Sequence, residues 1–563
     1  MTGHNRESSE IVRDAQDIIA MARAALQRAF STDAAAIADT PEAGPQGKIT
    51  VCVTIRVRGA VRGCWPATAN SLPAAIESAV RLTLRDPRCE WISRAELGQA
   101  LVEVWIQESR RAITGVLPRH LWGSHGLEVR GNDRSAFYLP YVGVEEESRD
   151  PDEFLERLFG KGRLWSAGSR ESSQLFETEW THVVEGKQSA RRFFRLRADD
   201  QQPRPSLVQM ATEAGRHLLN IQRFDGSYTY QYDPLRGRAV GSETNIVRVI
   251  LATYALARFG ALLARSSYPD CDAAPFLEGA ERGLSFIRSR LSRNSDGAYF
   301  RDDHGEALLG STALSLLAFA YFPDAAATSD ITPLLTNVLL KSQSGEGWFP
   351  NEILHPDRAG QQDFAPGQAI LALLKQNSRP LQDILPSLER AFSFYSSRPI
   401  EQASRFFLAW QCKAWCEMWR RTKIDRYADL AFRLLDRLAT FQMEPGENCP
   451  SDFVGGYRAS ADPSGIAPPT FLVSLFTEAA ALGWHVAVET NNHSRAAFYM
   501  QVVRRGIDCM FRLQISEDQH FMFVDPQLAV GGLRRDLASF QLRCDYAAHA
   551  LTCLTAAIEL GLS

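Results

Sequence analysis

Six apolar segments rich in small residues recur along the last two thirds of the chain, about 60 residues apart. They are TNIVRVILATYALARFG (244–260), STALSLLAFAYF (311–322), APGQAILALLKQ (365–376), SRFFLAWQCKAWCEMW (404–419), PTFLVSLFTEAAALG (469–483) and DYAAHALTCLTAAIEL (545–560). Each follows a more amphipathic helical pattern, such as 207–222. An apolar helix needs cover on most of its faces, which a ring of six inner helices wrapped by six outer ones supplies. The pattern predicts an all-α domain of six helical hairpins over residues 205–563.

The loops between these predicted helices repeat glycine and aromatic residues, as in RFDGSYTYQYD (223–233), NSDGAYFRDD (294–303) and SGEGWFPNE (344–352). Together the helices and loops resemble the (α/α)6 toroid of six-hairpin glycosidases, uronate epimerases, some polysaccharide lyases, lanthionine cyclases and terpenoid cyclases. The segment 531–551 is most similar to the carbohydrate-acting members. The resemblance implies a central cleft at one end of the ring.

The first 185 residues mix helix and strand patterns and predict an α+β domain. Residues 10–30 have the apolar spacing of an amphipathic helix, whereas 48–57 and 101–110 alternate as strands do. A helix over 71–86 would begin at the cap residue Ser71. Cys64 is then expected where a strand passes into a loop. The charged, proline-containing segment 186–204 predicts a linker between two domains.

The order of motifs over residues 10–182 resembles the AMMECR1 family. The similar blocks are VTIRVRGAVRGCWPA, DPRCEWISRAEL (86–97), WGSHGLEVRG (122–131), FYLPYV (137–142), DEFLERLFGKGRL (152–164) and LFETEW (175–180). Two departures are visible. Trp65-Pro66 replaces the family's Ile-Gly after the cysteine, and Lys161-Gly162-Arg163-Leu164 replaces its Lys-Ala-Gly-Leu. The resemblance implies the family's fold rather than a defined reaction.

Composition narrows the possible partners and compartment. The chain has 563 residues with 62 basic and 66 acidic side chains, and its net charge of −4 favours neither nucleic acid nor an anionic membrane. The N-terminus is polar, and the apolar stretch 250–264 is interrupted by Arg258, so we expect no signal peptide and no membrane span. Ten cysteines without a CxxC pair indicate reduced thiols and a cytoplasmic protein.

Polar residues near the starts of the predicted inner helices are the main candidates for a site, because these ends converge on the cleft. Asp545 and His549 are four residues apart and share a helix face beside Arg543. Asn245 and Arg248 share a face of the first inner helix. The alternatives are structural: Asp545 caps its helix, His549 is a core histidine, and Arg248 pairs with a carboxylate.

Two loops add further candidates. The loop GWFPNEILHPD (347–357) supplies Trp348 for stacking on a sugar ring and Glu352 for proton transfer, with His355 nearby. The loop 448–465 supplies Tyr457, with Asp452 and Arg458. The alternative for the first loop is a tucked loop that serves as a hydrophobic plug.

We predict that Asp545 and Glu352 act as a pair of carboxyls, one as acid and one as base. Arg248, Tyr457 and His549 would then orient the substrate and neutralise its acidic groups. The structural alternative is that Asp545 caps its helix and Glu352 points to solvent.

Cys64 is a third catalytic candidate. Arg62 would lower its pKa and Gly63 would allow close backbone approach. His120 and His125 are the nearest candidate bases, but no residue that would orient them is identifiable. A buried, structural cysteine beside a rigid Trp-Pro pair is the favoured interpretation, and thiol chemistry stays open.

Sharper chemistries find less support. No adjacent Cys-His pair suggests a zinc site, and the acidic run Asp302-Asp303 with Glu306 precedes its helix, unlike the metal site of a terpene cyclase. No phosphate loop or dinucleotide fingerprint is present. We therefore predict no metal site, and the sequence names no cofactor.

Two classes of function remain. The first is an enzyme whose toroid cleft hydrolyses, eliminates or epimerises a carbohydrate-like or acidic metabolite, with natural-product biosynthesis as one setting. A terpenoid-cyclase-like enzyme is a weaker variant of this class. The second is a non-catalytic assembly factor, because AMMECR1-like proteins often occur with Memo-like and radical SAM proteins.

Overall fold

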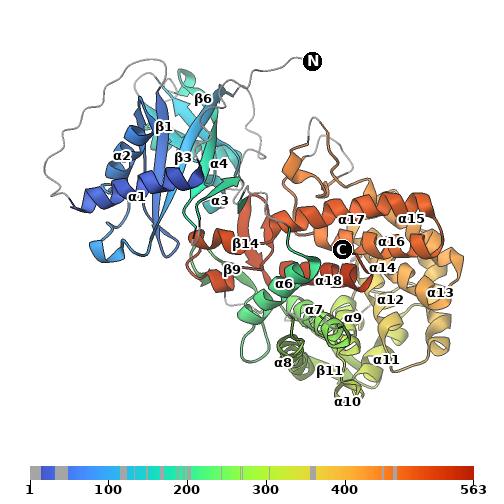
Figure 1. Ribbon diagram of the computed structural model, residues 1–563. Coiled ribbons are helices and arrows are strands. Elements are labelled where there is room, and N and C mark those ends of the chain that lie inside the picture. Colours follow the sequence, from blue (N-terminus) through green and yellow to red (C-terminus); the bar gives the residue numbers. More distant parts are fainter. Residues whose placement is uncertain are drawn as a thin grey trace.

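A computed structural model gives the fold of the chain (Figure 1). The described residues are 14–31, 48–113, 123–131, 134–146, 150–164, 170–186, 189–194, 197–198, 204–241, 244–266, 268, 271–302, 305–355, 363–446, 449–460 and 466–562. An α+β domain is followed by an all-α toroid, which confirms the predicted fold class.

The N-terminal domain is built on one antiparallel sheet. Its strands are β1 (Ile49–Val57), β2 (Ala60–Ala69), β3 (Ala100–Ala112), β4 (Gly126–Arg130), β5 (Ser135–Tyr138), β6 (Gln174–Val184), β7 (Arg191–Phe194) and β8 (Arg197–Ala198). Their order is β2-β1-β3-β6-β4-β5, with β7 paired to β6 and β8. The helices are α1 (Ala15–Ser31), α2 (Leu72–Thr83), α3 (Val142–Glu145) and α4 (Pro151–Lys161), with a 3-10 turn at Arg94–Glu96. Helices α1 and α2 cover one apolar face of the sheet.

The helices predicted over 10–30 and 71–86 and the strands predicted over 48–57 and 101–110 match α1, α2, β1 and β3, whereas the expectation for Cys64 was wrong. Ser71 caps α2 as predicted, since its side chain accepts a hydrogen bond from the backbone N–H of Ala74. Cys64 does not end a strand. The hairpin turns earlier, at Arg58-Gly59, and Cys64 lies in the middle of β2 opposite Thr54. Because β2 is the edge strand, Pro66 costs the sheet no hydrogen bond on its outer side, so the strand continues through it.

The segment predicted as a linker is partly strand. Residues 191–194 form β7, which pairs with β6 and buries Phe193. The charged residues and prolines of this segment suggested a linker. Its pairing with β6 depends on the position of the sheet, which local composition does not show. Residues 187–188, 195–196 and 199–203 of this segment lie outside the described residues.

The toroid consists of six hairpins, each an outer helix followed by an inner one. The outer helices are α6 (Leu207–Ile221), α8 (Ala274–Arg290), α11 (Thr332–Ser342), α13 (Leu381–Ser396), α15 (Asp425–Ala439) and α17 (His493–Leu513). The inner helices are α7 (Ile246–Arg265), α9 (Leu309–Tyr321), α12 (Ala365–Lys375), α14 (Arg405–Thr422), α16 (Val473–Glu489) and α18 (Cys544–Glu559). Each inner helix packs on the next, and α18 packs on α7, so the ring is closed. The inner helices match the six predicted apolar segments.

The remaining short elements lie in the connections of the toroid. They are α10 (Ala325–Thr328), β9 (Gln231–Asp233), β10 (Arg238–Ala239), β11 (Leu291–Asn294), β12 (Gly297–Phe300), β13 (Arg534–Asp536), β14 (Ser539–Arg543) and 3-10 turns at Ser451–Phe453, Glu517–Met522 and Pro526–Leu528. The sheet β10-β9-β14-β13 joins the first hairpin to the last and so closes the ring a second time.

A glutamine after the outer helix and a glycine in the next loop fasten several hairpins to their neighbours. Gln343 Nε2 donates to the carbonyl oxygens of Gly347 (3.0 Å) and Ser387 (2.9 Å), the latter in α13. Gly347 has a φ of 102°, and a Cβ there would lie 2.2 Å from the carbonyl oxygen of Arg390. The pairs Gln222/Gly226, Gln442/Gly455 and Gln514/Gly531 repeat this arrangement. This contact explains why the loops repeat glycine.

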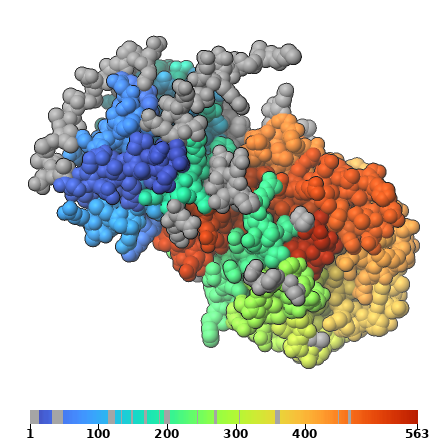
Figure 2. Space-filling model, viewed as in Figure 1, coloured from blue at the N-terminus to red at the C-terminus, as the bar shows by residue number. Residues whose placement is uncertain are grey.

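The two domains share a hydrophobic core. Trp105 and Tyr141 of the sheet domain pack in one cluster with Phe521, Phe523 and Phe540 of the toroid. Figure 2 shows the red C-terminal residues lying between the blue N-terminal domain and the green and yellow part of the ring. Gly59 reaches this interface so closely that a Cβ would lie 2.5 Å from the carbonyl carbon of Phe523. The domains therefore pack as one body.

Helix α7 is long and apolar enough to cross a membrane by length and composition alone. In the fold, 89% of that apolar stretch is buried inside the ring. Its apolar character is thus explained by its inner position.

Candidate functional site

A cavity of about 380 Å³ opens at the N-terminal ends of the inner helices. Four of the predicted site residues line it: Asn245, Arg248, Asp545 and His549. Asn245 caps α7 and accepts a hydrogen bond from the backbone N–H of Arg248. Ring closure places α7 beside α18, so residues 300 positions apart in the sequence meet here. The remaining lining is mainly apolar: aliphatic side chains alternate with four aromatic ones from the starts of three further inner helices, Phe364, Phe406, Trp410 and Phe471.

Asp545 is held by two arginines. Arg543 binds both carboxylate oxygens, from Nε at 2.9 Å and from Nη2 at 2.6 Å. Arg248 Nε lies 3.2 Å from Oδ2 of the same carboxylate. Asp545 is 1% exposed, whereas the Arg248 side chain is 35% exposed towards the cavity mouth. The carboxylate is therefore a fixed anion that orients two cations, one of which can meet a ligand.

His549 lies one turn further along α18 and is almost fully buried. Burial lowers the pKa of His549 to about 4, so its imidazole is neutral at neutral pH. Across the cavity, the buried Oε1 of Gln368 accepts no hydrogen bond from any described residue. The cavity thus combines a neutral base, a partly exposed guanidinium and an amide acceptor among apolar and aromatic side chains, a composition suited to a polar ring.

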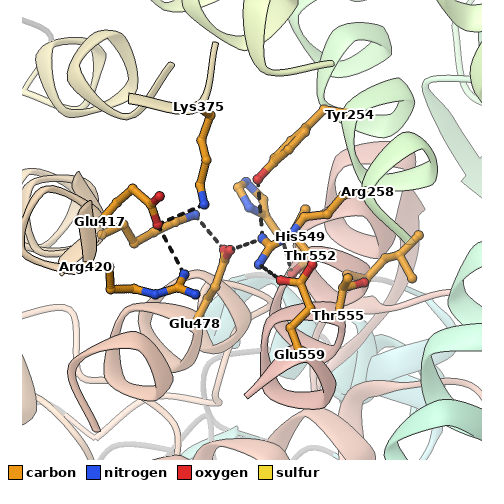
Figure 3. Close-up of polar contacts among 12 residues, drawn as sticks. Tyr254, Arg258, Lys375, Glu417, Arg420, Glu478, His549, Thr552, Thr555 and Glu559 are labelled. Atoms are coloured by element: carbon orange, nitrogen blue, oxygen red, sulfur yellow. Dashed lines mark hydrogen bonds and ion pairs between the residues drawn. The ribbon is translucent and has the colours of Figure 1, made fainter. Parts of the chain in front are cut away.

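Beneath the cavity, the axis of the toroid holds a buried ion network (Figure 3). Glu478 accepts from Lys413 Nζ (2.6 Å) and Arg258 Nη1 (2.7 Å), and Arg258 also binds Glu559 (2.8 Å). Burial alone would raise the pKa of Glu478, but the adjacent Lys413 and Arg258 lower it to about 2. The same network contributes to the electrostatic surroundings of His549. A second pair, Lys375–Glu417 (2.8 Å), continues the network towards the far end of the ring.

Glu352 and Trp348 lie outside the residues that line this cavity. Glu352 is buried, and its Oε1 accepts from the backbone N–H groups of Ala307 (3.1 Å) and Leu354 (3.2 Å). Trp348 packs against the main core of the ring. The backbone of Glu352 forms a β-bridge with that of Leu308, which lines the cavity, so Glu352 lies next to a lining residue without lining the cavity itself.

Tyr457 is also absent from the lining of the cavity. It is buried, forms a bridge with Gln442 and packs edge-on against Phe476 with ring centroids 4.9 Å apart. Burial raises its pKa well above the usual range. Arg458 donates to the carbonyl oxygen of Thr440, and the carbonyl oxygen of Asp452 accepts from Arg512. In the structure, the described residues of the loop 448–465 that were predicted to bind substrate contact other parts of the protein instead of the cavity.

Cys64 lines a separate cavity of about 510 Å³ in the N-terminal domain. His125 does not line it, and His120 lies outside the described residues. A histidine that the sequence analysis missed, His182, is buried in the sheet beside this cavity. Its Nε2 lies 2.8 Å from Glu103 Oε2 and its Nδ1 lies 3.2 Å from the hydroxyl of Tyr141. Strand register brings them together, since β6 pairs with β3 across the sheet, and nothing local in the sequence signals it.

Glu103 is the carboxylate that contacts both His182 and Arg56. Arg56 binds it at 2.5 Å and also binds Glu145 at 2.6 Å. Burial would raise the pKa of Glu103, but Arg56 and His182 lower it to about 2. Glu103 is thus an ionised carboxylate in the core.

Acidic residues do not gather into a metal site in the described part of the chain, where no group of three His, Cys, Asp or Glu side chains is placed to hold a metal. Asp302 accepts from the backbone N–H of Glu306 and so closes a turn. Asp303 lies outside the described residues.

Comparison with known proteins assigns the N-terminal domain. The model of the AMMECR1 family matches residues 19–180. A protein of Methanosarcina acetivorans is 33% identical over 131 residues, and the match covers 21% of this chain and 65% of that relative. The crystal structure of an uncharacterised protein, PH0010 from Pyrococcus horikoshii, aligns with 22% identity over 32% of this chain and 96% of its own, with a TM-score of 0.27.

The helical part aligns with a crystal structure of D-mannose isomerase. The alignment has 11% identity, covers 64% of this chain and 99% of that one, and gives a TM-score of 0.45. The chain joins an AMMECR1 domain at residues 19–180 to an (α/α)6 toroid.

Proposed function

We propose that the toroid cavity is the active site of an enzyme that moves a proton on a carbohydrate-like or acidic substrate, by epimerisation or elimination next to a carbonyl group. One observation carries the proposal: neutral, buried His549 and partly exposed Arg248 face one apolar cavity that contains four aromatic side chains, with Asp545 fixed between two guanidinium groups. The aromatic side chains suit the apolar faces of a sugar ring, and Arg248 suits a carboxylate or a developing enolate.

Proton transfer by His549 fits the cavity better than hydrolysis by two carboxyls. Glycoside hydrolysis uses two carboxyl groups on either side of the bond, about 5 to 10 Å apart. Asp545 is the only carboxylate among the described residues that line this cavity, and both its oxygens are engaged by Arg543. Glu352 does not line the cavity. In this proposal His549 takes the proton, and Arg248 stabilises the charge that forms on the carbonyl oxygen.

The low pKa of His549 is consistent with this role. A base with a pKa of about 4 is weak in the empty cavity. An anionic substrate or enolate beside the imidazole would favour the protonated form and raise the pKa towards neutrality. The base would therefore become effective when substrate is bound. Ten free cysteines also suit a reducing compartment, so we place this activity in the cytoplasm.

Hydrogen exchange tests the proposal. The full chain is incubated in D₂O with a panel of aldoses, uronates and their disaccharides, and deuterium at the carbon next to the carbonyl is followed by NMR. We expect exchange with at least one member, abolished in His549→Gln and strongly reduced in Arg248→Gln. His493→Gln, at an exposed position at the start of α17, is the matched control.

Three results would count against the proposal. Exchange that survives in His549→Gln would remove the assigned base. Glycoside hydrolysis that depends on Glu352 would restore the paired-carboxyl mechanism. If no member of the panel exchanges or binds, the non-catalytic role as an assembly factor with Memo-like and radical SAM proteins becomes the better proposal.

A further inference from the structure

The 510 Å³ cavity of the N-terminal domain has the features of a second ligand site. It lies between the face of the sheet formed by β1, β2 and β3 and the segment that carries Phe137, Tyr138 and Tyr141. Trp65 and Trp105 lie opposite that segment, and charged side chains of both signs also line the cavity: Arg56, Arg88 and Lys161, with Asp86, Glu103, Glu145 and Glu146. The indole Nε1–H of Trp105 is buried and meets no acceptor among the described residues. A cavity with aromatic side chains and a buried unpaired donor is a place where a ligand gains a hydrogen bond.

Three cysteines lie at this cavity: Cys64 and Cys89 line it, and Cys52 lies behind Cys64. Cys52 and Cys64 are diagonal neighbours across β1 and β2, because Cys64 faces Thr54 and Cys52 faces Pro66. Their sulfur atoms are 3.5 Å apart. Cys64 is half-buried and lines the cavity, whereas Cys52 is 0% exposed and lies in the core. The register of the hairpin therefore creates a front thiol and a back thiol.

The surroundings of Cys64 favour the thiolate. A hydrogen bond between the Cys52 and Cys64 sulfurs lowers the pKa of Cys64, and the Thr54 hydroxyl, which donates to the Cys64 sulfur at 3.3 Å, lowers it further against the opposing effect of burial. Burial raises the pKa of Cys52. Asp86 accepts from the Cys64 backbone N–H (3.0 Å) and Arg88 donates to its carbonyl oxygen (2.7 Å), so the backbone of Cys64 is fixed on both sides.

Lys161 supplies a positive charge at the same cavity. Its Nζ donates to the carbonyl oxygen of Phe137 (2.8 Å) and lies 4.7 Å from the ring centroid of Tyr138. Glu146 lines the same cavity and interacts electrostatically with Lys161, but across the described ranges no carboxylate lies within ion-pair distance of its Nζ. A ligand with a carboxylate would complete this site.

We propose that this cavity is a thiol–disulfide exchange site that takes small disulfides carrying carboxylate groups. The Cys64 thiolate attacks one sulfur of the ligand, a Cys64–ligand disulfide forms, and the other half leaves as a thiolate. Cys52 then loses its proton to that thiolate and attacks the Cys64 sulfur, which forms the Cys52–Cys64 disulfide and releases the second half of the ligand as a thiolate that takes a proton from solvent. The protein is oxidised by two electrons and the ligand is reduced to two thiols.

The short separation of the two sulfurs favours the second step. A disulfide bond is about 2 Å long, so the two sulfurs must approach by roughly 1.5 Å from their 3.5 Å separation. The site is independent of the toroid cavity, so failure of one proposal leaves the other in place. A transient catalytic disulfide is also compatible with a reducing compartment.

Mass spectrometry of the full chain, reduced and then treated with glutathione disulfide at pH 7, tests the proposal. The wild-type chain is expected to lose two hydrogens and to yield a peptide linked through Cys52 and Cys64. Cys52→Ser is expected to stop at a glutathione adduct on Cys64, and Cys64→Ser to give neither product. Cys449→Ser, which removes a half-buried cysteine of the toroid, is the matched control and is expected to react as the wild type does.

The carboxylate preference has its own comparison. Lys161→Gln is expected to slow the reaction with glutathione disulfide about fivefold, the effect of losing one partly exposed ion pair, and to leave the reaction with uncharged hydroxyethyl disulfide unchanged. Alkylation of the wild-type chain by iodoacetamide at pH 7 is a check that needs no variant, with Cys64 expected to react before Cys449. The proposal is overturned if Cys52→Ser gives no adduct on Cys64, if oxidation persists in Cys64→Ser, or if Cys449 is alkylated first.

Discussion

The ion network on the toroid axis gives a prediction whose size follows from the structure. Glu478 is 0% exposed and neutralises both Lys413 and Arg258. Its pKa of about 2, against an ordinary 4.5, corresponds to roughly 3 kcal/mol of stability at neutral pH. Glu478→Gln keeps the shape and removes the charge. Arg258 retains Glu559, but Lys413 keeps no carboxylate in the described structure, so a loss of about 3–5 kcal/mol is expected.

The pH dependence makes the test sharper. Because the pKa of Glu478 is lowered in the folded chain, its contribution is complete above the unfolded value of 4.5 and disappears as pH falls towards 2. Urea unfolding of the wild-type chain and Glu478→Gln should therefore differ most at pH 7. At pH 3 the difference attributable to this carboxyl falls to roughly 1–1.5 kcal/mol. Equal stability at pH 7, or a difference that does not change with pH, would refute the reasoning.

A surface pair provides the control for this experiment. Glu444 binds Arg505 at 2.5 Å, but the Glu444 side chain is 60% exposed. Glu444→Gln removes the same charge in water, where an ion pair contributes about 1 kcal/mol or less. Only the buried substitution should lower the urea midpoint strongly.

Three further outcomes are expected. Gly347→Ala should lower the thermal midpoint by several degrees because a Cβ collides with the next outer helix, whereas Gly345→Ala, which has open space around it, should not. The imidazole of His549 should titrate near pH 4 in an NMR experiment on the ligand-free chain, and a midpoint near 6.5 would contradict its burial. Gly59→Ala should force the sheet domain away from Phe523, seen as faster amide exchange at the interface without loss of helix content.

The toroid was predictable because its signal is periodic and repeated. An inner helix must be apolar on all its faces, so each of the six segments shows the same apolar pattern. Their number and regular spacing predict six hairpins. The glutamine–glycine contacts that fasten the loops were visible only as recurring glycines. What the sequence could not show is that Gln343 reaches the backbone of α13, since that contact depends on the packing of successive outer helices.

For the candidate site, residues on the repeated helices were predictable, whereas residues in loops were not. Arg248, Asp545 and His549 lie at helix N-termini, and ring closure forces those ends together, so residue type and position in the repeat sufficed. Glu352 and Tyr457 lie in loops, where direction depends on a few local hydrogen bonds. In the sheet domain, the Cys52–Cys64 contact depends on the register of β1 against β2. The sequence analysis placed Cys64 at the end of a strand, so it did not predict a partner for Cys64 on β1.

The contact between the domains bears on the toroid cavity itself. Strand β14 leads directly into α18, so it positions Arg543 against Asp545, which lines the cavity. Phe540 on this strand is buried in the cluster that also contains Trp105 and Tyr141 of the sheet domain. Without the N-terminal domain, Phe540 would be exposed to water and β14 would lose the contacts that hold it in place. The N-terminal domain therefore packs against the strand that leads to the Arg543–Asp545 pair, and the shared core keeps this strand covered.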